Sequence, residues 1–490
     1  MTELRPQAAQ VSLEDVCRRL RIPAVSGMVS GLSLDTRLVR AGDLYAALPG
    51  ANTHGARFAQ TAVDAGAVAV LTDPAGAEML TDLAVPVLIV DDPRAALGML
   101  ATVIYPGPRP TLVGITGTNG KTTTAHCVAA AAEAVDVPSA VLGTLGIRFR
   151  EFHDYSGRTT PEAPSLHAAL ATLAEAGAGL AAMEVSSHAL ALHRVSGLQF
   201  EVAVFLGLTQ DHLDFHNSMD EYFAVKSRLF TSEYARNAVI NVDDTWGARL
   251  ASACSIPLTT YGLTETADWH PRAIEVDESG RTHFVAVGPR GEIPVDLAMP
   301  GGFNVANALA ALAAVDALGL DPALAVRGLA QVSVPGRFER VDNDRGIGAY
   351  VDYAHTPDAV TRVLDVARAA TRGRLITVLG CGGDRDAAKR PLMGAAAAQE
   401  SDLVVVTDDN PRSEDPALIR RAVLDGAGST AIVHEVADRA AAIRFAVSEA
   451  RAGDCIMVLG KGHETGQEIA GVLHPFDDRI ELRHALGAQA

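Results

Sequence analysis

The sequence predicts an α/β protein with three domains, the central one built on a parallel sheet and the C-terminal one on a doubly wound sheet. A chain of 490 residues is too long for one ordinary domain and suggests about three. Stretches rich in proline and glycine, at 105–110 and 334–337, divide the chain. Between and after these breaks, apolar runs alternate with helical patterns, as they do in βαβ units. We therefore predict domains over residues 1–108, 109–335 and 336–490.

The composition excludes several classes of protein. A formal net charge of -18 argues against a nucleic-acid-binding protein, because such proteins usually carry a basic face. The five cysteines lie far apart without CxxC spacing, so neither a disulfide framework nor a zinc site is indicated. The N-terminal segment contains Glu3, Arg5 and Glu14 and lacks an apolar signal-peptide core. We expect a cytoplasmic protein that contacts no membrane and acts as a monomer.

The first domain has the pattern of a small α/β unit. Strand-like apolar runs occur at 68–71 and 86–90, and a helical pattern occurs at 57–65. The cluster Tyr105-Pro-Gly-Pro-Arg-Pro110 is stiff and cannot join a sheet, so it predicts a linker.

The second domain opens with a strand, a glycine-rich turn and a helix. The apolar run at 112–115 leads into Gly117-Thr-Asn-Gly-Lys-Thr-Thr123, and an alanine-rich helical pattern follows. Glycines let backbone N–H groups turn inward, the helix N-terminus adds partial positive charge, and Lys121 adds a full charge. Thr122 offers a hydroxyl to a magnesium ion, so the loop predicts a P-loop ATPase domain that binds ATP and Mg²⁺. The match is imperfect because Ile115 stands at the first glycine of the general pattern, and a turn without a ligand is the alternative. The predicted nucleotide contacts here are Gly117, Thr118, Asn119, Gly120, Lys121, Thr122 and Thr123.

Strands are expected around residues 112, 182, 202 and 238, in a parallel sheet. Segments near 273, 283 and 293 are separated by turn sequences, so we expect antiparallel hairpins there, at the edge of this sheet.

Two side chains of this domain are candidate magnesium ligands. Glu184 directly follows an apolar strand at 180–182, and His212 lies in a polar loop. Either residue alone also fits an ordinary polar loop position.

Lys226 is placed among apolar residues. Ser218 and Glu221 form a capping box that predicts a helix through residue 230. Its apolar stripe at i, i+1, i+4, i+7 and i+8 places the lysine in the middle of Tyr222, Phe223, Leu229 and Phe230. Burial favours the neutral amine, which can act as a nucleophile or react with carbon dioxide to give a carbamate that binds magnesium. The alternative, which spacing alone favours, is a lysine that extends along the edge of the stripe into solvent.

Amides and cations near the final break are further candidates. Asn304 and Asn307 begin a helix and can either contact an adenine edge or cap that helix. Arg337 and Arg340 flank a possible hinge, where a cation can approach the nucleotide.

In the last domain, four apolar strands end in polar clusters. The strands end at Val351, Leu379, Val406 and Leu459, and polar residues follow at once. Ligands of open parallel sheets bind beyond the carboxyl ends of the strands, so a shared site is predicted in a Rossmann-like domain. One such cluster alone fits an ordinary turn.

Six motifs occur in the order and rough spacing of the Mur ligase family. They are Thr116-Gly-Thr-Asn-Gly-Lys-Thr122, Met183-Glu-Val-Ser-Ser-His188, Asp211-His-Leu-Asp214, Phe303-Asn-Val-Ala-Asn307, Pro335-Gly-Arg-Phe-Glu339 and Asp352-Tyr-Ala-His355. The chain resembles that family over nearly its whole length. Further motifs resemble the members that add the third residue of the peptidoglycan stem peptide, namely Leu34-Asp-Thr-Arg37, Cys381-Gly-Gly-Asp-Arg-Asp386, Asp409-Asn-Pro-Arg412 and Gly460-Lys-Gly-His-Glu464.

The resemblance implies an ATP-dependent amide ligase of cell-wall biogenesis. Its first domain would bind UDP-N-acetylmuramoyl-L-alanyl-D-glutamate, its second ATP with Mg²⁺, and its third the incoming amino acid. In the family, ATP phosphorylates the γ-carboxylate of the D-glutamyl group, and the amine of the amino acid attacks the acyl phosphate.

The resemblance also assigns roles to individual residues. Lys226 would be a carbamylated lysine and, with Lys121, Glu184 and His212, catalytic; Thr122, Glu184, His212 and Lys226 would hold magnesium. Asn304, Asn307, Arg337 and Asp352 would contact the nucleotide. The sugar nucleotide would contact Leu34, Thr36, Ala51, Asn52, Thr53, Thr159, Thr160, Ser186 and Arg194. Leu192 stands where related sequences often have glutamine, and Thr36 replaces a common serine but keeps the hydroxyl.

The third domain indicates the amino-acid substrate. Members that use meso-2,6-diaminopimelate carry the loop found here as Asp409, Asn410, Pro411 and Arg412, and Arg385, Gly460 and Glu464 complete the matching pocket. The Arg412 guanidinium can hold the second carboxylate of diaminopimelate, which lysine lacks. Losing such a contact can cost about 10⁴-fold in selectivity. Glu464 suits the distal ammonium. We predict the diaminopimelate-adding ligase; the alternatives are an L-lysine-adding ligase, a folylpolyglutamate synthetase-like ligase, and a non-catalytic nucleotide-binding switch.

Overall fold

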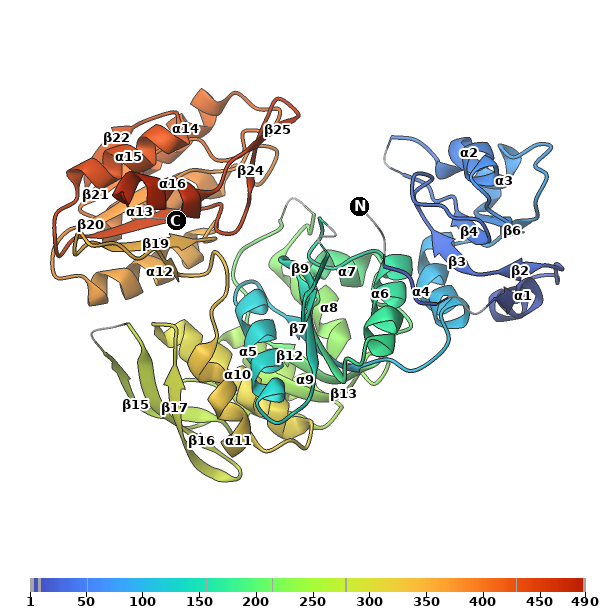
Figure 1. Ribbon diagram of the computed structural model, residues 1–490, viewed down its shortest axis with the longest axis horizontal. Coiled ribbons are helices and arrows are strands. Elements are labelled where there is room, and N and C mark those ends of the chain that lie inside the picture. The colour runs from blue at the N-terminus through green and yellow to red at the C-terminus, as the bar shows by residue number, and fades with distance from the viewer. Residues whose placement is uncertain are drawn as a thin grey trace.

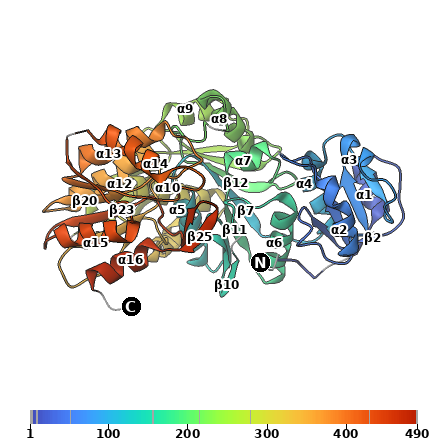
Figure 2. The ribbon, with the colours of Figure 1, turned by 90° about the horizontal axis from the view of Figure 1, so that it is seen from above.

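The computed structural model describes residues 4–7, 10–50, 52–154, 157–213, 215–277, 280–428 and 430–487. The predicted substrate contact Ala51 lies outside these ranges. Three domains follow one another along the chain, and Figures 1 and 2 show the central domain between the other two. The predicted boundaries after residues 108 and 335 fall between the sheets of neighbouring domains.

The N-terminal domain is built on a parallel sheet of four strands in the order β3-β4-β5-β6. The strands predicted at 68–71 and 86–90 are β5 and β6, and the predicted helix is η1 followed by α2. The elements are β1 (Val11–Ser12), α1 (Leu13–Leu20), β2 (Met28–Val29), β3 (Gly31–Ser33), β4 (Asp43–Ala46), η1 (Gly55–Phe58), α2 (Ala59–Asp64), β5 (Ala69–Thr72), α3 (Pro74–Glu78), β6 (Val87–Ile89) and α4 (Pro93–Ile104).

The central domain contains an eight-stranded sheet in the order β10-β9-β8-β11-β7-β12-β13-β14. The elements of this sheet are β7 (Thr111–Thr116), α5 (Lys121–Glu133), β8 (Ser139–Gly143), β9 (Gly146–Phe149), β10 (Phe152–Asp154), α6 (Ala163–Glu175), β11 (Leu180–Glu184), α7 (Ser187–Ala191), β12 (Phe200–Phe205), α8 (Met219–Ser227), η2 (Arg228–Phe230), β13 (Ala235–Asn241), α9 (Thr245–Ala253) and β14 (Leu258–Tyr261). The strands from β8 to β14 in this order are parallel, as predicted, and β9 and β10 extend the sheet as an antiparallel edge.

Helices cover both faces of this sheet. Side chains of β7 alternate between two apolar clusters: Val113 and Ile115 pack toward α5 and α10, whereas Leu112 packs toward α6 to α9. Strands buried on both faces explain why the sequence shows continuous apolar runs here.

The hairpins predicted near 273, 283 and 293 form, but their expected place at the edge of the main sheet is wrong. They make a separate antiparallel sheet in the order β15-β16-β17. Its inner face packs with α10 in one apolar cluster, so it covers that helix rather than extending the main sheet. The elements are β15 (His270–Val276), β16 (Thr282–Gly288), β17 (Gly291–Leu297), α10 (Gly302–Ala317), α11 (Pro322–Ala325) and η3 (Val326–Gln331).

The C-terminal domain is doubly wound, as predicted. Its sheet has the order β18-β19-β23-β20-β21-β22, in which only β18 is antiparallel to its neighbour. One apolar cluster packs the sheet against α12 to α14, and another packs it against α15 and α16. The elements are β18 (Glu339–Arg340), β19 (Gly348–Asp352), α12 (Pro357–Ala370), β20 (Leu375–Leu379), α13 (Lys389–Glu400), β21 (Leu403–Val406), α14 (Pro416–Ala427), β22 (Ile432–Glu435), α15 (Arg439–Glu449), β23 (Cys455–Leu459), β24 (Gly466–Ile469), β25 (Val472–Pro475) and α16 (Asp478–Leu486).

Among the helices within the described ranges, none is long and apolar enough to cross a membrane.

Candidate active site

The predicted phosphate loop joins β7 to α5. Gly120 has φ 86°, and a side chain there would meet the Asn307 amide oxygen at 2.6 Å, so both backbone and space demand glycine. The Lys121 ammonium donates to the carbonyl oxygens of Gly117 and Thr118 at 3.0 and 2.8 Å. Burial lowers the pKa of Lys121, and the Glu184 and Asp211 carboxylates oppose that change. The loop therefore places the Lys121 cation at the N-terminus of α5.

Lys226 lies on α8 beside this loop. Ser218 caps the helix by accepting from the backbone N–H of Glu221 at 3.2 Å, as the sequence predicts. The lysine is 1% exposed, and its ammonium donates to the Thr116 hydroxyl at 3.2 Å and to the Gly117 carbonyl at 3.0 Å. Burial first, and then the nearby Lys121 charge, lowers the pKa of Lys226 well below its ordinary value. The prediction that this lysine is buried is confirmed, and the solvent-directed alternative is wrong.

The predicted magnesium ligands lie around the same loop. Glu184 at the end of β11 is buried, and its carboxylate accepts from the Thr144 N–H at 2.8 Å and the Thr144 hydroxyl at 3.1 Å. His212 has a left-handed backbone with φ 56°, and burial lowers its pKa to about 4. In the part of the chain that is described, no group of three or more His, Cys, Asp or Glu side chains forms a ready metal cage.

Asn304 and Asn307 connect two helices behind the loop. Asn304 donates to the Pro300 carbonyl at 2.8 Å and accepts from Asn307 at 3.2 Å, while Thr124 of α5 donates to Asn307 at 3.2 Å. Both amides are buried. These contacts hold α10 against the phosphate loop, which is a positioning role in addition to the predicted nucleotide contact.

Two contacts join the third domain to the phosphate loop. The Arg337 guanidinium donates to the Thr122 hydroxyl at 3.2 Å and lies 4.3 Å from the centre of the Tyr353 ring. Asn119 of the loop donates to Asp358 on α12 at 3.2 Å. Arg337 therefore lies at the phosphate loop, and its predicted approach to the nucleotide stays a prediction.

Asp352 supports this hinge. It accepts from the backbone N–H groups of Phe338 and Ala354 at 2.6 and 2.7 Å, so it fixes the chain directly after Arg337 and directly after Tyr353. Burial raises the pKa of Asp352.

A cleft of about 690 Å³ lies between the first and central domains. The predicted substrate contacts Leu34 and Thr36 line it. Thr53 accepts from the backbone of Gly50, a lining residue, at 3.1 Å, and Asn52 lies between them. The first domain therefore supplies one wall of a cavity large enough for a nucleotide.

The central domain supplies the opposite wall through Glu162. This carboxylate accepts from Arg94 at 3.2 Å, Arg158 at 2.8 Å and Arg194 at 3.0 Å. Arg94 belongs to α4 of the first domain, so the cluster also connects the two domains. The predicted contact Arg194 thus lies behind the wall.

The other predicted contacts lie near the end of β11. The Thr160 hydroxyl donates to the Glu184 carbonyl at 2.8 Å and accepts from the Ser186 N–H at 3.2 Å. Thr159 contacts the Thr144 hydroxyl at 3.1 Å. These residues therefore lie near Glu184, and none of the three lines the cleft itself.

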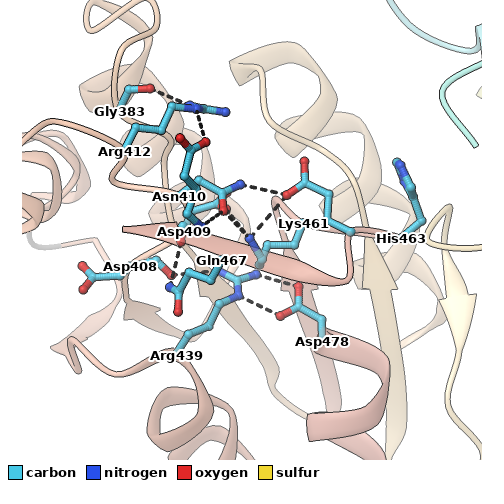
Figure 3. Close-up of polar contacts among 12 residues, drawn as sticks. Gly383, Asp408, Asp409, Asn410, Arg412, Arg439, Lys461, His463, Gln467 and Asp478 are labelled. Carbon is cyan, nitrogen blue, oxygen red and sulfur yellow. Dashed lines mark hydrogen bonds and ion pairs between the residues drawn. The ribbon is translucent and has the colours of Figure 1, made fainter. Parts of the chain in front are cut away.

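The third domain gathers a buried polar cluster, shown in Figure 3. The Lys461 ammonium contacts Asp409 at 3.2 Å, Asn410 at 2.8 Å and Glu464 at 3.3 Å. Asn410 also donates to Glu464 at 2.8 Å. Burial, followed by the Asp409 carboxylate, raises the pKa of Glu464. Gly460 is required beside the cluster, because a side chain there would meet Asp409 at 2.8 Å.

Arg412 lies at the rim of this cluster. It has a left-handed backbone with φ 53°, donates to the Gly383 carbonyl at 2.5 Å and contacts Glu468 at 3.5 Å. The preceding Pro411 accepts from the Glu414 N–H at 3.1 Å, which closes the turn. Arg385 is exposed and contacts only its neighbouring Asp384 carbonyl, at 3.4 Å, among the hydrogen bonds of the described residues. The structure thus groups Asp409, Asn410 and Glu464, with Arg412 beside them and Arg385 apart.

Sequence reasoning did not single out Lys461, Glu162, Thr144 or Asp358. Lys461 has a signal, because the chain contains only four lysines and this one stands inside a polar cluster after a strand. The other three act through contacts between distant segments, which the sequence does not reveal.

An ion pair beneath the cluster should control stability. Arg439 and Asp478 are both 0% exposed and form two hydrogen bonds of 2.7 Å. Asp478→Ala would leave a buried guanidinium without its partner, so we expect the free energy of unfolding to fall by about 3–5 kcal/mol. Chemical denaturation measures this change. Asp425→Ala, which removes the exposed partner of Arg421 on α14, should cost less than about 1 kcal/mol. Equal effects of the two substitutions would contradict the prediction.

Comparison with known proteins agrees with this arrangement. Family models match residues 28–105 (Mur ligase family, catalytic domain), 115–315 (Mur ligase middle domain) and 336–462 (Mur ligase, glutamate ligase domain). A UDP-N-acetylmuramoyl-L-alanyl-D-glutamate--2,6-diaminopimelate ligase of Streptomyces coelicolor is 48% identical and covers 98% of both chains. One of Corynebacterium glutamicum is 47% identical and covers 94% of this chain and 92% of its own.

Solved structures show the same fold. A UDP-N-acetylmuramoyl-L-alanyl-D-glutamate--2,6-diaminopimelate ligase with 33% identity superimposes with a TM-score of 0.68 and covers 98% of this chain and 99% of its own. A MurF ligase of Thermotoga maritima in complex with ADP is 18% identical and has a TM-score of 0.66, with 93% and 96% covered. The matches span all three domains, and the chain belongs to the Mur ligase family.

Proposed function

We propose that this chain is an ATP-dependent ligase that adds meso-2,6-diaminopimelate to UDP-N-acetylmuramoyl-L-alanyl-D-glutamate in peptidoglycan synthesis. The observation that carries the proposal is the polar cluster of the third domain, where Asn410 donates to Glu464 and Arg412 of the same loop donates to the Gly383 carbonyl. Diaminopimelate carries a distal carboxylate and a distal ammonium, and these two groups can pair with Arg412 and Glu464. Relatives at 47–48% identity bear the name of this activity.

The phosphate loop supplies the activation step. ATP would phosphorylate the γ-carboxylate of the D-glutamyl group, which breaks the bond to the γ-phosphate and forms an acyl phosphate with release of ADP. Lys121 and the backbone N–H groups at the start of α5 would stabilise charge on the moving phosphoryl group. The amine of the amino acid would then attack the acyl carbon, and phosphate would leave. Deprotonated amine is needed for this attack.

Magnesium fits the oxygen-rich residues around the loop. Mg²⁺ is usually bound through one or two carboxylates together with substrate phosphates. Thr122, Glu184 and His212 would hold it there, and a carbamylated Lys226 would add a second carboxylate. The ion would neutralise charge on the nucleotide phosphates. The Lys226 amine is buried, which favours the neutral form that reacts with carbon dioxide.

We propose that the sugar nucleotide occupies the cleft between the first two domains. On one side, the nucleotide would contact Leu34, Thr36, Asn52 and Thr53. On the other side, Arg194 would act from behind the wall of the cleft. Thr159, Thr160 and Ser186 would guide the peptide portion toward Glu184. Asn304, Asn307, Arg337 and Asp352 would position ATP, and Thr118, Asn119, Gly120 and Thr123 would surround its phosphates.

We also propose domains over 1–108, 109–335 and 336–490, and action as a monomer in the cytoplasm, where ATP is available.

Competing ligase activities are less well supported. L-Lysine would offer Arg412 no substrate carboxylate, which penalises lysine. A folylpolyglutamate synthase of Mycobacterium tuberculosis is 19% identical, a likeness that shows the fold alone.

A panel of amino acids tests the proposal. The protein is incubated with ATP, Mg²⁺ and UDP-N-acetylmuramoyl-L-alanyl-D-glutamate, and phosphate release is measured with meso-diaminopimelate, L-lysine, glutamate or no amino acid. We expect release above the blank with diaminopimelate and a product mass that equals the condensation of the two substrates. Release with lysine at the same rate would favour the lysine-adding alternative. ATP binding without release under any condition would favour a nucleotide-binding switch.

A further inference from the structure

Lysine is rare in this chain, and Lys461 is a buried lysine that lies outside the phosphate loop region. Only four of the 41 basic residues are lysines, namely Lys121, Lys226, Lys389 and Lys461. The first two belong to the phosphate loop region, and Lys389 begins α13. Lys461 is 0% exposed, so its charge is held entirely inside the third domain. A buried ammonium is costly unless every proton has an acceptor.

Three acceptors surround the Lys461 ammonium. An ammonium has three protons to donate, and it meets Asp409 at 3.2 Å, Asn410 at 2.8 Å and Glu464 at 3.3 Å. The acceptors come from two separate loops, after β21 and after β23. Figure 3 shows Asp409 and Asn410 directed toward the lysine. The residue therefore holds together the two loops that form the amino-acid pocket.

Lys461 also fixes the orientation of the Asn410 amide. The amide oxygen accepts from Lys461 at 2.8 Å and from the Glu468 N–H at 3.0 Å, so the amide nitrogen faces Glu464 and donates to it at 2.8 Å. Both this nitrogen and the lysine bind the same oxygen of Glu464, Oε2. The Glu464 side chain is 29% exposed, so part of it remains accessible from outside the cluster.

The charges of the cluster leave one net negative charge. Asp409 and Glu464 contribute two negative charges, and Lys461 contributes one positive charge. The nearby Arg439 is paired with Asp478, so this pair adds no net charge to the cluster. One uncompensated carboxylate suits a substrate ammonium.

We propose that Lys461 is a positioning residue for the amino-acid substrate, because it orients Asn410 and keeps Glu464 ionised to receive the distal ammonium. This inference rests on the proposed function. Burial and the Asp409 carboxylate raise the pKa of Glu464, whereas Lys461 lowers it. Without the lysine, the two carboxylates would lie close together with no cation between them, and one would take up a proton.

Arginine should not replace this lysine. The three acceptors lie within 3.3 Å of a single nitrogen, whereas a guanidinium spreads its donors over a wide planar fork. The chain uses arginine for nearly every other cation, which is consistent with a specific need for a compact ammonium here.

The test compares steady-state kinetics of Lys461→Met and Lys461→Arg with the unaltered enzyme. For Lys461→Met we expect the KM for diaminopimelate to rise by about 10- to 100-fold at about pH 7, as for a lost charge-assisted contact. The KM values for ATP and for the sugar nucleotide should stay within about threefold. As the pH rises toward about 9, Glu464 should lose its proton and the KM for diaminopimelate should fall again. Lys461→Arg should not restore the unaltered KM.

Arg421→Met is the matched control, since it removes an exposed cation from α14 in the same domain. It should leave all three KM values unchanged. An equal rise in every KM of Lys461→Met, without pH dependence, would show a structural role only and overturn the inference. A KM for diaminopimelate within about threefold of the unaltered value would do the same.

Two further outcomes keep the inference testable. If thermal unfolding shows that Lys461→Met does not fold, Lys461→Gln, which retains hydrogen-bond donors but no charge, replaces it under the same criteria. If the unaltered protein releases no phosphate with diaminopimelate, the proposed function fails and the inference fails with it.

Discussion

Lys226→Ala should lower kcat by about 10³-fold, because it removes the side chain that we propose to carry a magnesium-binding carbamate beside the phosphate loop. The lysine is 1% exposed and lies within 3.2 Å of Thr116 and Gly117 of the phosphate loop. Burial lowers the pKa of this lysine, which favours the neutral amine, and carbamylation would convert the site to a carboxylate. Phosphate release with diaminopimelate measures the loss, and added bicarbonate should not restore activity, since alanine cannot form a carbamate.

The carbamate itself can be observed directly. With only four lysines in the chain, a carbamate formed from ¹³C-bicarbonate should give a resolved carbon NMR signal in the unaltered protein and none in Lys226→Ala. Arg249→Ala serves as the control, because Arg249 forms an exposed ion pair with Asp220 of α8 and should retain activity. A fully active Lys226→Ala, or a carbamate signal that persists in it, would contradict the prediction.

Arg412→Ala should remove most of the preference for diaminopimelate over lysine. The guanidinium is held by the Gly383 carbonyl and Glu468, so it is preorganised before the substrate binds. In this variant the distal carboxylate of diaminopimelate would lose its partner, so kcat/KM for diaminopimelate should fall by about 10⁴-fold. Lysine presents no carboxylate to this arginine, so its already low rate should change little.

Competition kinetics with both amino acids measure the ratio. Arg412→Lys should recover only part of the lost rate, because an ammonium cannot bind a carboxylate through two parallel hydrogen bonds. If Arg412→Ala kept the full preference for diaminopimelate, another residue would have to select the substrate.

The sequence predicts the parallel sheets well because their strands are continuous apolar runs with polar ends. β19, β20, β21 and β23 end at or within one residue of the predicted positions. The sheet made by β15 to β17 was assigned to the wrong place, since alternation and turn residues reveal hairpin pairing but not the surface that the hairpin covers. Strands β8 to β10 lie outside the predicted strands; they are short, and glycines flank the turn between β8 and β9.

In the candidate site too, some features can be predicted from the sequence and others cannot. The helical spacing places Lys226 within an apolar stripe, but spacing alone favours a side chain that extends into solvent, so only the structure establishes its burial. The contacts of Lys461 could not be predicted, because its partners Asp409 and Asn410 lie about fifty residues earlier and contact it only after β21 and β23 become neighbours of β20. The predicted roles of these side chains in binding substrate, nucleotide and metal stay predictions.

The backbone pairing between Arg412 and β24 has a mechanical consequence. The Arg412 N–H donates to the Glu468 carbonyl at 3.0 Å, and the Ala470 N–H donates to the Arg412 carbonyl at 2.7 Å. Any displacement of the arginine loop therefore pulls on the hairpin of β24 and β25. Hydrogen–deuterium exchange at Ala470, an amide with no direct part in the pocket, should slow when the amino acid is bound and report occupancy from the outside of the domain.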